Sequence, residues 1–282
     1  MADGGLGGAG AVYGGLRGAD PGNDDLRFGT GSLTPEQTAR AVRPAVWELG
    51  GMFSESRSIL RRARLMGMST WAFYVTGRGG ALGDVRAETV AAAIGFIAPE
   101  AVADGWEAAR RVALPRQVAA INLDECCRWG AEHLGRFPKV ARLAELTQRV
   151  VAAADATGMP LFAAWRAMPV PDDTPGARAA VWLYLLREYL SGAQLLAATV
   201  SGMSPLEAVL AGPEGEQGAL AYGWQPPYPP IGPLVRRQIW ADAVADRIAS
   251  GAFAALAVPE RLELVKLLAR AVASLRTLAS VG

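Results

Sequence analysis

Histidine and cysteine are nearly absent from this chain of 282 residues, which contains one histidine and two cysteines. The histidine is His133, and the cysteines, Cys126 and Cys127, are neighbours in the sequence. Imidazole and thiolate groups supply most zinc ligands, general bases and activated nucleophiles in enzymes. We therefore expect no cofactor and no metal, although carboxylates alone could still form a magnesium site. His133 is expected at a helix end or on the surface, and the two thiols are expected to be buried and reduced.

Lysine is also scarce, since Lys139 and Lys266 are the only two. The 28 lysine and arginine residues nearly balance 27 aspartate and glutamate residues, which gives a formal net charge of +1. Proteins that bind nucleic acid or anionic membranes usually carry a strongly basic face, so this balance predicts neither partner. The abundance of arginine, alanine, glycine and proline is typical of a GC-rich genome, such as that of an actinobacterium.

Long apolar runs are missing as well. No stretch reaches the roughly 18 apolar residues that indicate a membrane-spanning helix. The N-terminus lacks the basic start and compact apolar segment of a secretory signal. These two absences predict a cytoplasmic protein.

The composition divides the chain into three parts. Residues 1–31 contain eleven glycines and few side chains that could pack, which predicts a flexible glycine-rich arm. Breakers near residues 155–160 then separate an N-terminal helical half, residues 32–157, from a C-terminal helical half, residues 158–282.

Helical periodicity recurs through both halves, and no segment shows the alternation of a half-buried strand. Thr34, Pro35 and Gln37 form the signature of a capped helix start. The fold class predicted is therefore all-α, a two-halved helical bundle-like domain with a ligand pocket between the halves. The helices are expected near residues 35–49, 54–66, 84–97, 115–134, 138–157, 175–200, 204–211, 233–250 and 259–279.

Two segments, residues 71–106 and 160–210, resemble a largely uncharacterised actinobacterial family that is often labelled helix-turn-helix-like. The family carries a Tyr-Phe-x-x-Arg-x-x-x-Leu-Gly motif, to which residues 73–83 are similar, and an Arg-Glu-His-Arg-Gly-Asp-Gly-His motif at residues 187–194. Arg187 and Glu188 are kept here, but Tyr189 and Gln194 replace the two histidines. The resemblance therefore implies that any histidine chemistry of the relatives is lost or replaced. After Leu210 the winged-helix pattern that the label implies is not recognisable.

Polar side chains interrupt the otherwise apolar helix expected over residues 175–200. Arg187, Ser191 and Gln194 share one face, and Tyr184, Glu188 and Ser191 form an adjoining stripe. Burying such groups is costly unless they are paired. The pattern therefore predicts either a structural arginine–glutamate network or a ligand pocket, and the sequence leaves both open.

A second arginine, Arg78, lies among glycines that would let a ligand approach its guanidinium. The alternative is a helix-to-helix turn in which Arg78 pairs with a nearby carboxylate such as Glu55. We expect Arg78, Arg187, Gln194 and two tyrosines, Tyr74 and Tyr184, to bind substrate. The candidate catalytic residues are Glu188, Tyr189 and Glu55, because a desolvated carboxyl group can transfer protons.

These residue types favour a cofactor-independent enzyme that acts on an apolar small molecule in bacterial specialised metabolism, as a cyclase, isomerase or dehydratase. The alternative is a non-catalytic small-molecule-binding protein, such as a sensor, a resistance protein or a regulatory partner. A DNA-binding regulator is a third hypothesis with less support, because Arg236 and Arg237 alone make a poor recognition helix. A homodimer is possible in each case.

Overall fold

The computed structural model describes residues 32–169 and 174–281, so the predicted arm at residues 1–31 lies outside it. Within these ranges the chain forms thirteen α-helices and no strand, which confirms the all-α prediction. A 3₁₀ turn, Gly80–Leu82, and a π-helical turn, Gly130–Leu134, extend two of the helices. The α-helices are α1 (Pro35–Ser54), α2 (Arg57–Leu65), α3 (Thr70–Gly79), α4 (Ala87–Ile94), α5 (Pro99–Arg110), α6 (Pro115–Trp129), α7 (Val140–Ala153), α8 (Pro160–Arg166), α9 (Pro175–Val200), α10 (Pro205–Ala211), α11 (Gly215–Ala221), α12 (Leu234–Phe253) and α13 (Val258–Val281).

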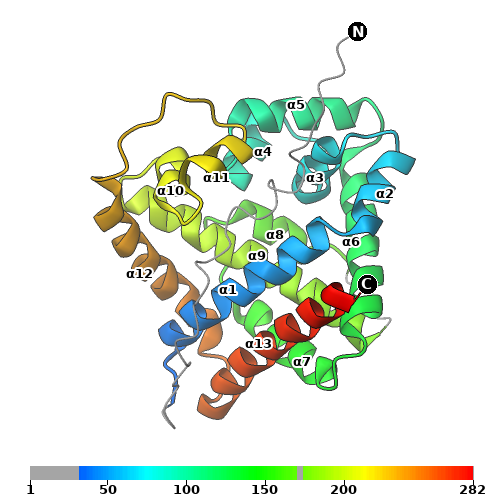
Figure 1. Cartoon of the computed structure of the whole chain (residues 1–282), viewed down its shortest axis with the longest axis vertical. Helices are drawn as coiled ribbons and strands as arrows, with labels where there is room; N and C mark the ends of the chain where they lie inside the picture. Colours follow the sequence, from blue (N-terminus) through cyan, green and yellow to red (C-terminus); the bar gives the residue numbers. More distant parts are fainter. Residues whose placement is uncertain (1–31, 170–173, 282) are drawn as a thin grey trace.

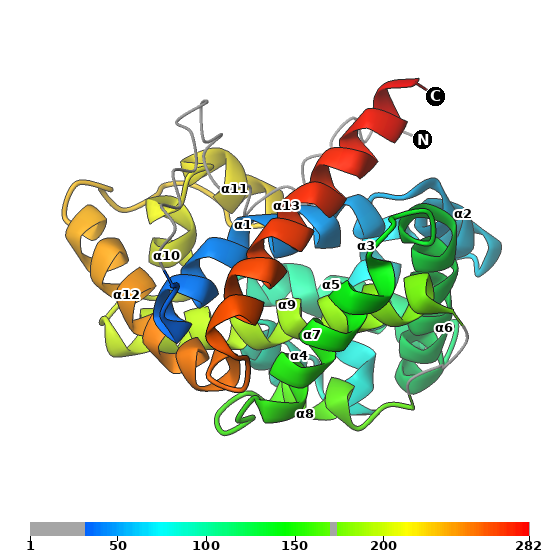
Figure 2. The ribbon, with the colours of Figure 1, turned by 90° about the horizontal axis from the view of Figure 1, so that it is seen from below.

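Helix α9 runs through the middle of the molecule, with α1 and α13 side by side across it (Figures 1 and 2). It packs against α1, α6, α7, α8 and α12. One connected cluster of buried apolar side chains extends from Leu33 to Leu275 and so includes residues of both predicted halves. Glu188 and Ser191, two polar residues of α9, are therefore buried among packed helices.

The predicted start of the first helix is confirmed in detail. The Thr34 amide donates to the Gln37 side-chain oxygen at 2.8 Å, and the Gln37 amide donates to the Thr34 hydroxyl at 3.1 Å. Pro35 occupies the first turn, where its missing N–H costs nothing. This reciprocal cap fixes where α1 begins.

Four helices, α3, α5, α8 and α11, were not predicted from the sequence. At α3, α5 and α8, glycine or proline was interpreted as a breaker. Pro99 and Pro160 instead begin their helices, a position that proline tolerates well. The glycines of α3 and the turn after it permit close packing. A Cβ on Gly79 would lie 2.5 Å from Val90 Cγ1, and one on Gly80 would lie 2.1 Å from the Pro115 carbonyl oxygen.

The segment of residues 224–233 packs onto its own domain. The Trp224 indole donates to the Phe96 carbonyl oxygen at 2.9 Å, and the Tyr228 hydroxyl donates to the Trp224 carbonyl oxygen at 2.7 Å. This fixes the connection between α11 and α12 beside the end of α4.

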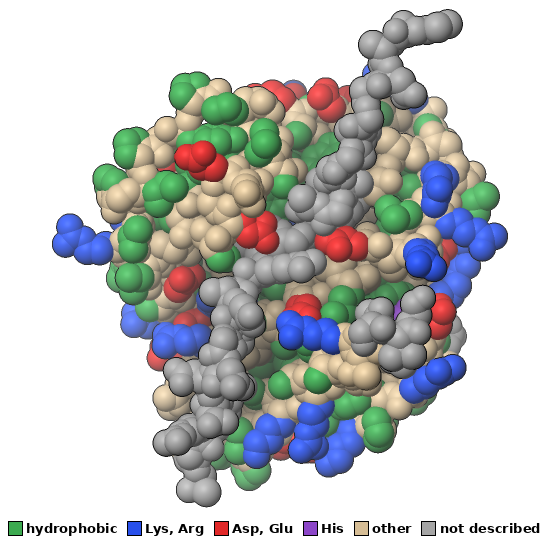
Figure 3. All heavy atoms as spheres, in the orientation of Figure 1, with side chains coloured by type: hydrophobic (Ala, Val, Ile, Leu, Met, Phe, Trp, Pro, Cys, Tyr) green, Lys and Arg blue, Asp and Glu red, His purple; other side chains and the backbone are tan. Residues whose placement is uncertain are grey.

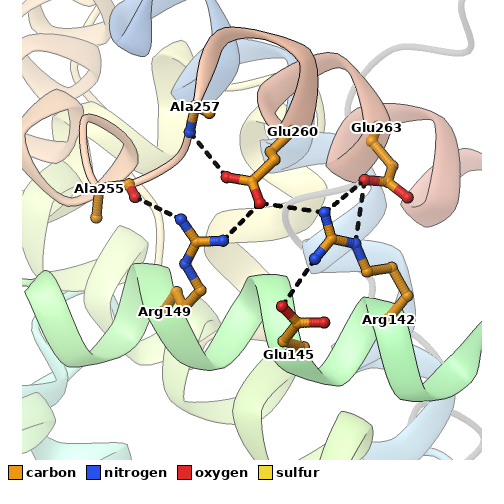
Figure 4. A network of polar contacts seen from close by, with 7 residues as sticks. All are labelled: Arg142, Glu145, Arg149, Ala255, Ala257, Glu260 and Glu263. Carbon is orange, nitrogen blue, oxygen red and sulfur yellow. Dashed lines mark hydrogen bonds and ion pairs between the residues drawn. The ribbon is translucent and has the colours of Figure 1, made fainter.

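A network of ion pairs joins α7 to α13 near the surface (Figure 4). Arg142 donates to Glu263 at 2.9 Å and to Glu260 at 3.1 Å, and Arg149 donates to Glu260 at 2.6 Å. Hydrogen bonds from Arg149 and from the Ala257 amide hold the pKa of Glu260 at about 2, below its usual value. The network fixes α13 along α7.

Candidate functional site

A buried ion pair joins α3 to the middle of α9. Arg78 Nε donates to Glu188 Oε1 at 2.8 Å, Arg78 Nη2 donates to Glu188 Oε2 at 3.0 Å, and Nη2 also donates to the Ser191 hydroxyl at 3.2 Å. The side chains of Arg78 and Glu188 are 10% and 1% exposed. Burial opposes the charge on Arg78, but the Glu188 carboxylate, together with Tyr74 and Tyr184, raises the pKa of the guanidinium above its usual value. Arg78 is thus a permanent buried cation whose carboxylate partner is Glu188, not Glu55.

Local packing positions Arg78 for this pair. Gly77 and Gly79 flank it in α3, and a Cβ on Gly77 would lie 3.3 Å from three side-chain atoms of Asn122. The Trp165 indole donates to the Arg78 carbonyl oxygen at 2.8 Å. The glycines that suggested ligand access to Arg78 therefore allow neighbouring helices to pack closely against α3. Helix α8 holds the backbone of Arg78 in place through Trp165.

A cavity of about 530 Å³ lies beside the ion pair, and we call it the α4–α9 cavity. Its polar wall contains Arg78, Glu188 and Ser191, and Arg78 Nη1 makes no hydrogen bond within the described parts of the chain. The cavity is otherwise mostly apolar and receives residues from both sequence halves. The remaining lining residues are Leu82, Glu88, Thr89, Ala92, Ala93, Ile94, Gly158, Met159, Pro160, Leu161, Phe162, Gly192 and Leu195.

The three predicted tyrosines do not line this cavity. Tyr184 is buried, its ring meets that of Trp165 edge-on at 4.9 Å, and burial raises the pKa of its hydroxyl. Tyr74 contacts the Trp71 ring at 5.9 Å. Tyr189 donates to the Ile248 carbonyl oxygen at 3.3 Å, and burial raises its pKa to about 12. Tyr189, predicted as a catalytic residue, is therefore placed as a core residue that joins α9 to α12.

Arg187 and Gln194 share a face of α9, as the sequence predicted, and this face meets α1. Arg187 lies along the α1 backbone at Gly50, where a Cβ would come within 2.4 Å of its Cδ atom and 2.7 Å of its Nε atom. Gln194 lines a second cavity of about 310 Å³ with Arg43 and Trp47 of α1. The structure therefore separates these two residues from Arg78 and Glu188.

Glu55 lies elsewhere again, at the end of α1. It lines a groove of about 1000 Å³ beside α2 and α6, together with Arg57, Arg61 and His133. His133 stacks on the Trp129 ring at 5.2 Å, and its Nδ1 lies 3.0 Å from the Trp129 carbonyl oxygen. Arg78 and Glu188 thus form an ion pair. Arg187 and Gln194 meet α1 instead, and Glu55 lines a separate groove.

Two groups of polar residues were not selected from the sequence. Ser191 was recognised on the polar stripe but was not assigned a role, although it contacts Arg78. Asp246 is buried and accepts hydrogen bonds from Arg40 and Arg43, which lie more than 200 positions earlier in the chain. No sequence spacing indicates such a distant pairing, whereas Ser191 stood on the right face of its helix.

No group of three or more histidine, cysteine, aspartate or glutamate side chains within residues 32–169 and 174–281 is placed to hold a metal ion. In those ranges no helix combines the length and the apolar character needed to cross a bilayer.

Helices α2 and α3 are joined by a short turn, residues 66–69, in which Gly67 has a φ of 71°. Most of α3 is buried, including Phe73, Val75 and Arg78, so this second helix cannot enter a DNA groove. Helix α2 instead exposes Arg57, Arg61 and Arg64. Figure 3 shows basic side chains gathered on the side of the molecule where α2 lies in Figure 1.

Comparison with known proteins gives one result. No curated protein and no solved structure matches the chain. A helix-turn-helix family matches residues 39–280, nearly the whole described part. Its description points toward nucleic acid, whereas the charge balance predicted no such partner. The extent of the match shows that the chain belongs to this helix-turn-helix family.

Proposed function

We propose that this protein binds an apolar small molecule in the α4–α9 cavity and does so without catalysing a reaction. The cavity volume of about 530 Å³ falls in the range of ligand pockets, and its lining combines many apolar residues with a few polar groups. Arg78 Nη1, which makes no hydrogen bond inside the described ranges, offers a donor to a carbonyl or hydroxyl oxygen of the ligand.

The pairing of Glu188 with Arg78 is the observation that favours binding over catalysis. A general base takes up the substrate proton and loses its negative charge as it does so. Both oxygens of Glu188 accept hydrogen bonds from Arg78, so protonation would leave the buried guanidinium without its counter-charge. Tyr189 and Glu55, the other candidate catalytic residues, do not line this cavity. The enzyme hypothesis therefore has less support from this geometry than the binding hypothesis.

An uncharged apolar dye, N-phenyl-1-naphthylamine, tests the proposal because its fluorescence rises when it leaves water. We expect one dye molecule to bind per chain, and Ala92→Trp at the mouth of the cavity to weaken binding about tenfold or more by filling the space. The matched control is Ala152→Trp, at an exposed position of α7 that lines none of the three cavities. Equal dye affinity in the two variants would contradict binding at this site.

Nucleic-acid binding is a second candidate function, which family membership and the exposed arginines of α2 favour. If Arg57, Arg61 and Arg64 each contact one phosphate, affinity for a short duplex should fall about fortyfold between about 50 and about 200 mM salt. Changing all three arginines to alanine should remove both the binding and its salt dependence. Fluorescence anisotropy of a labelled duplex measures both, and binding that survives the triple substitution would exclude α2 as the contact surface.

A further inference from the structure

A second cavity lies on another side of α9, between α1, α10 and α12, and we call it the α1–α12 cavity. Its volume is about 310 Å³, and it shares no lining residue with the α4–α9 cavity. Helix α9 presents Gln194 and Ala198 to it, whereas Ser191 and Leu195 line the other cavity. The two spaces are therefore separate sites on one helix.

Polar atoms without partners concentrate in the wall of the α1–α12 cavity. Arg43 Nε, Gln194 Oε1 and Gln238 Oε1 are buried and make no hydrogen bond among the described residues. Buried polar groups are nearly always paired in folded proteins, so a cluster of unpaired ones indicates that something outside the described chain satisfies them.

The charges around the cavity balance one another. Asp246 accepts a hydrogen bond from Arg40 Nε at 2.7 Å and another from Arg43 Nη2. Asp242 lies 3.7 Å from Arg43 Nη1 and accepts a hydrogen bond from Gln238 Nε2 at 3.1 Å. Two guanidinium groups thus face two carboxylates, which leaves no excess charge to attract an ion. The same contacts hold the side chains of Arg43 and Gln238 in place, so that Gln238 Oε1 remains available as an acceptor.

We propose that the α1–α12 cavity binds an uncharged planar nitrogen heterocycle, the chemical class to which nucleobases belong. Ring N–H or amino groups would donate to the oxygens of Gln194 and Gln238, and a carbonyl or ring nitrogen would accept from Arg43 Nε–H or the Trp47 indole. Because the terminal torsion of glutamine is broad, the amide of Gln194 can turn toward a ligand at little cost. Trp47 and Phe96 provide aromatic surface for the flat ring, and alanines of α9, α10 and α12 keep the space open.

Isothermal titration of adenine, cytosine and uracil, one at a time, into the full chain tests this site. At least one base should bind once per chain with a dissociation constant below about 1 mM. Gln194→Leu keeps most of the side-chain volume and removes the amide, so it should weaken that binding about tenfold or more. The same variant should raise the Tm of the unliganded protein, because an unpaired buried amide is lost.

A second variant and a control complete the design. Ala208→Phe fills the cavity from α10 and should abolish binding of the base, which keeps the test decisive if Gln194→Leu does not fold. Ala92→Trp, at the mouth of the other cavity, should leave the affinity for the base unchanged, and Gln194→Leu should leave dye binding unchanged. Failure of all three bases to bind the wild-type chain would overturn the proposal, as would an affinity that neither Gln194→Leu nor Ala208→Phe changes. Neither result bears on dye binding in the α4–α9 cavity.

Discussion

Replacing Glu188 with leucine is expected to lower the free energy of unfolding by about 3–5 kcal/mol. The substitution leaves the Arg78 guanidinium buried without its carboxylate, and arginine cannot escape the cost by losing its proton. Ser191 would remain as a neutral acceptor at 3.2 Å, which cannot compensate a full charge. Urea denaturation of the two proteins at neutral pH measures the difference.

The double variant Arg78→Met with Glu188→Leu is the matched comparison. Removing both charges also removes the need to desolvate them, so this variant should recover most of the stability that Glu188→Leu loses. A double-mutant cycle over Arg78 and Glu188 would then give a large coupling energy. If the single variant is as stable as the wild type, the ion pair is not buried as described.

Truncating Trp165 to alanine is the second change with a large expected effect, a loss of about 3–5 kcal/mol in the free energy of unfolding. Trp165 is 1% exposed, its ring meets Tyr184, and its indole donates to the backbone of Arg78. The substitution therefore opens a void beside α9 and leaves a buried carbonyl oxygen without its donor. Thermal and urea unfolding report the loss.

Trp240→Ala is the control, because it removes a tryptophan side chain that is 51% exposed on α12. It should lower the free energy of unfolding by about 1 kcal/mol at most. Trp165→Phe keeps much of the ring but not the N–H, so its smaller loss separates the hydrogen bond from the packing. Similar losses for Trp165→Ala and Trp240→Ala would show that Trp165 does not organise the site.

Periodicity and capping residues were sufficient to predict most of the helices. The cap at Thr34 and the long apolar stretch of α9 are local features, and local sequence determines them. The helices that were missed, such as α3 and α8, contain glycines or begin with proline. In these places tertiary packing decides the structure. Gly80 lets the backbone of Pro115 approach, but in the sequence alone such a glycine cannot be distinguished from one that ends a helix.

The candidate site was predictable only in part. The two stripes of α9 follow from helical geometry, and the structure does direct Glu188 and Ser191 to one side and Arg187 and Gln194 to another. The residues that contact each stripe were not predictable. Arg78, for example, is 110 positions from Glu188, and nothing in the sequence spacing links the two. Arg43 and Asp246 were missed for the same reason, being 203 positions apart.

The contact between Gly50 and Arg187 constrains how this protein can change during evolution. Because a Cβ at position 50 would occupy the space of the Arg187 side chain, any residue larger than glycine there must displace the guanidinium or be matched by a smaller residue at position 187. The two positions should therefore covary among homologues: chains that keep the arginine should keep the glycine, and chains with a larger residue at position 50 should have a smaller one at position 187. Replacement of the arginine is then the step that has to come first, or together with replacement of the glycine, when this helix crossing diverges.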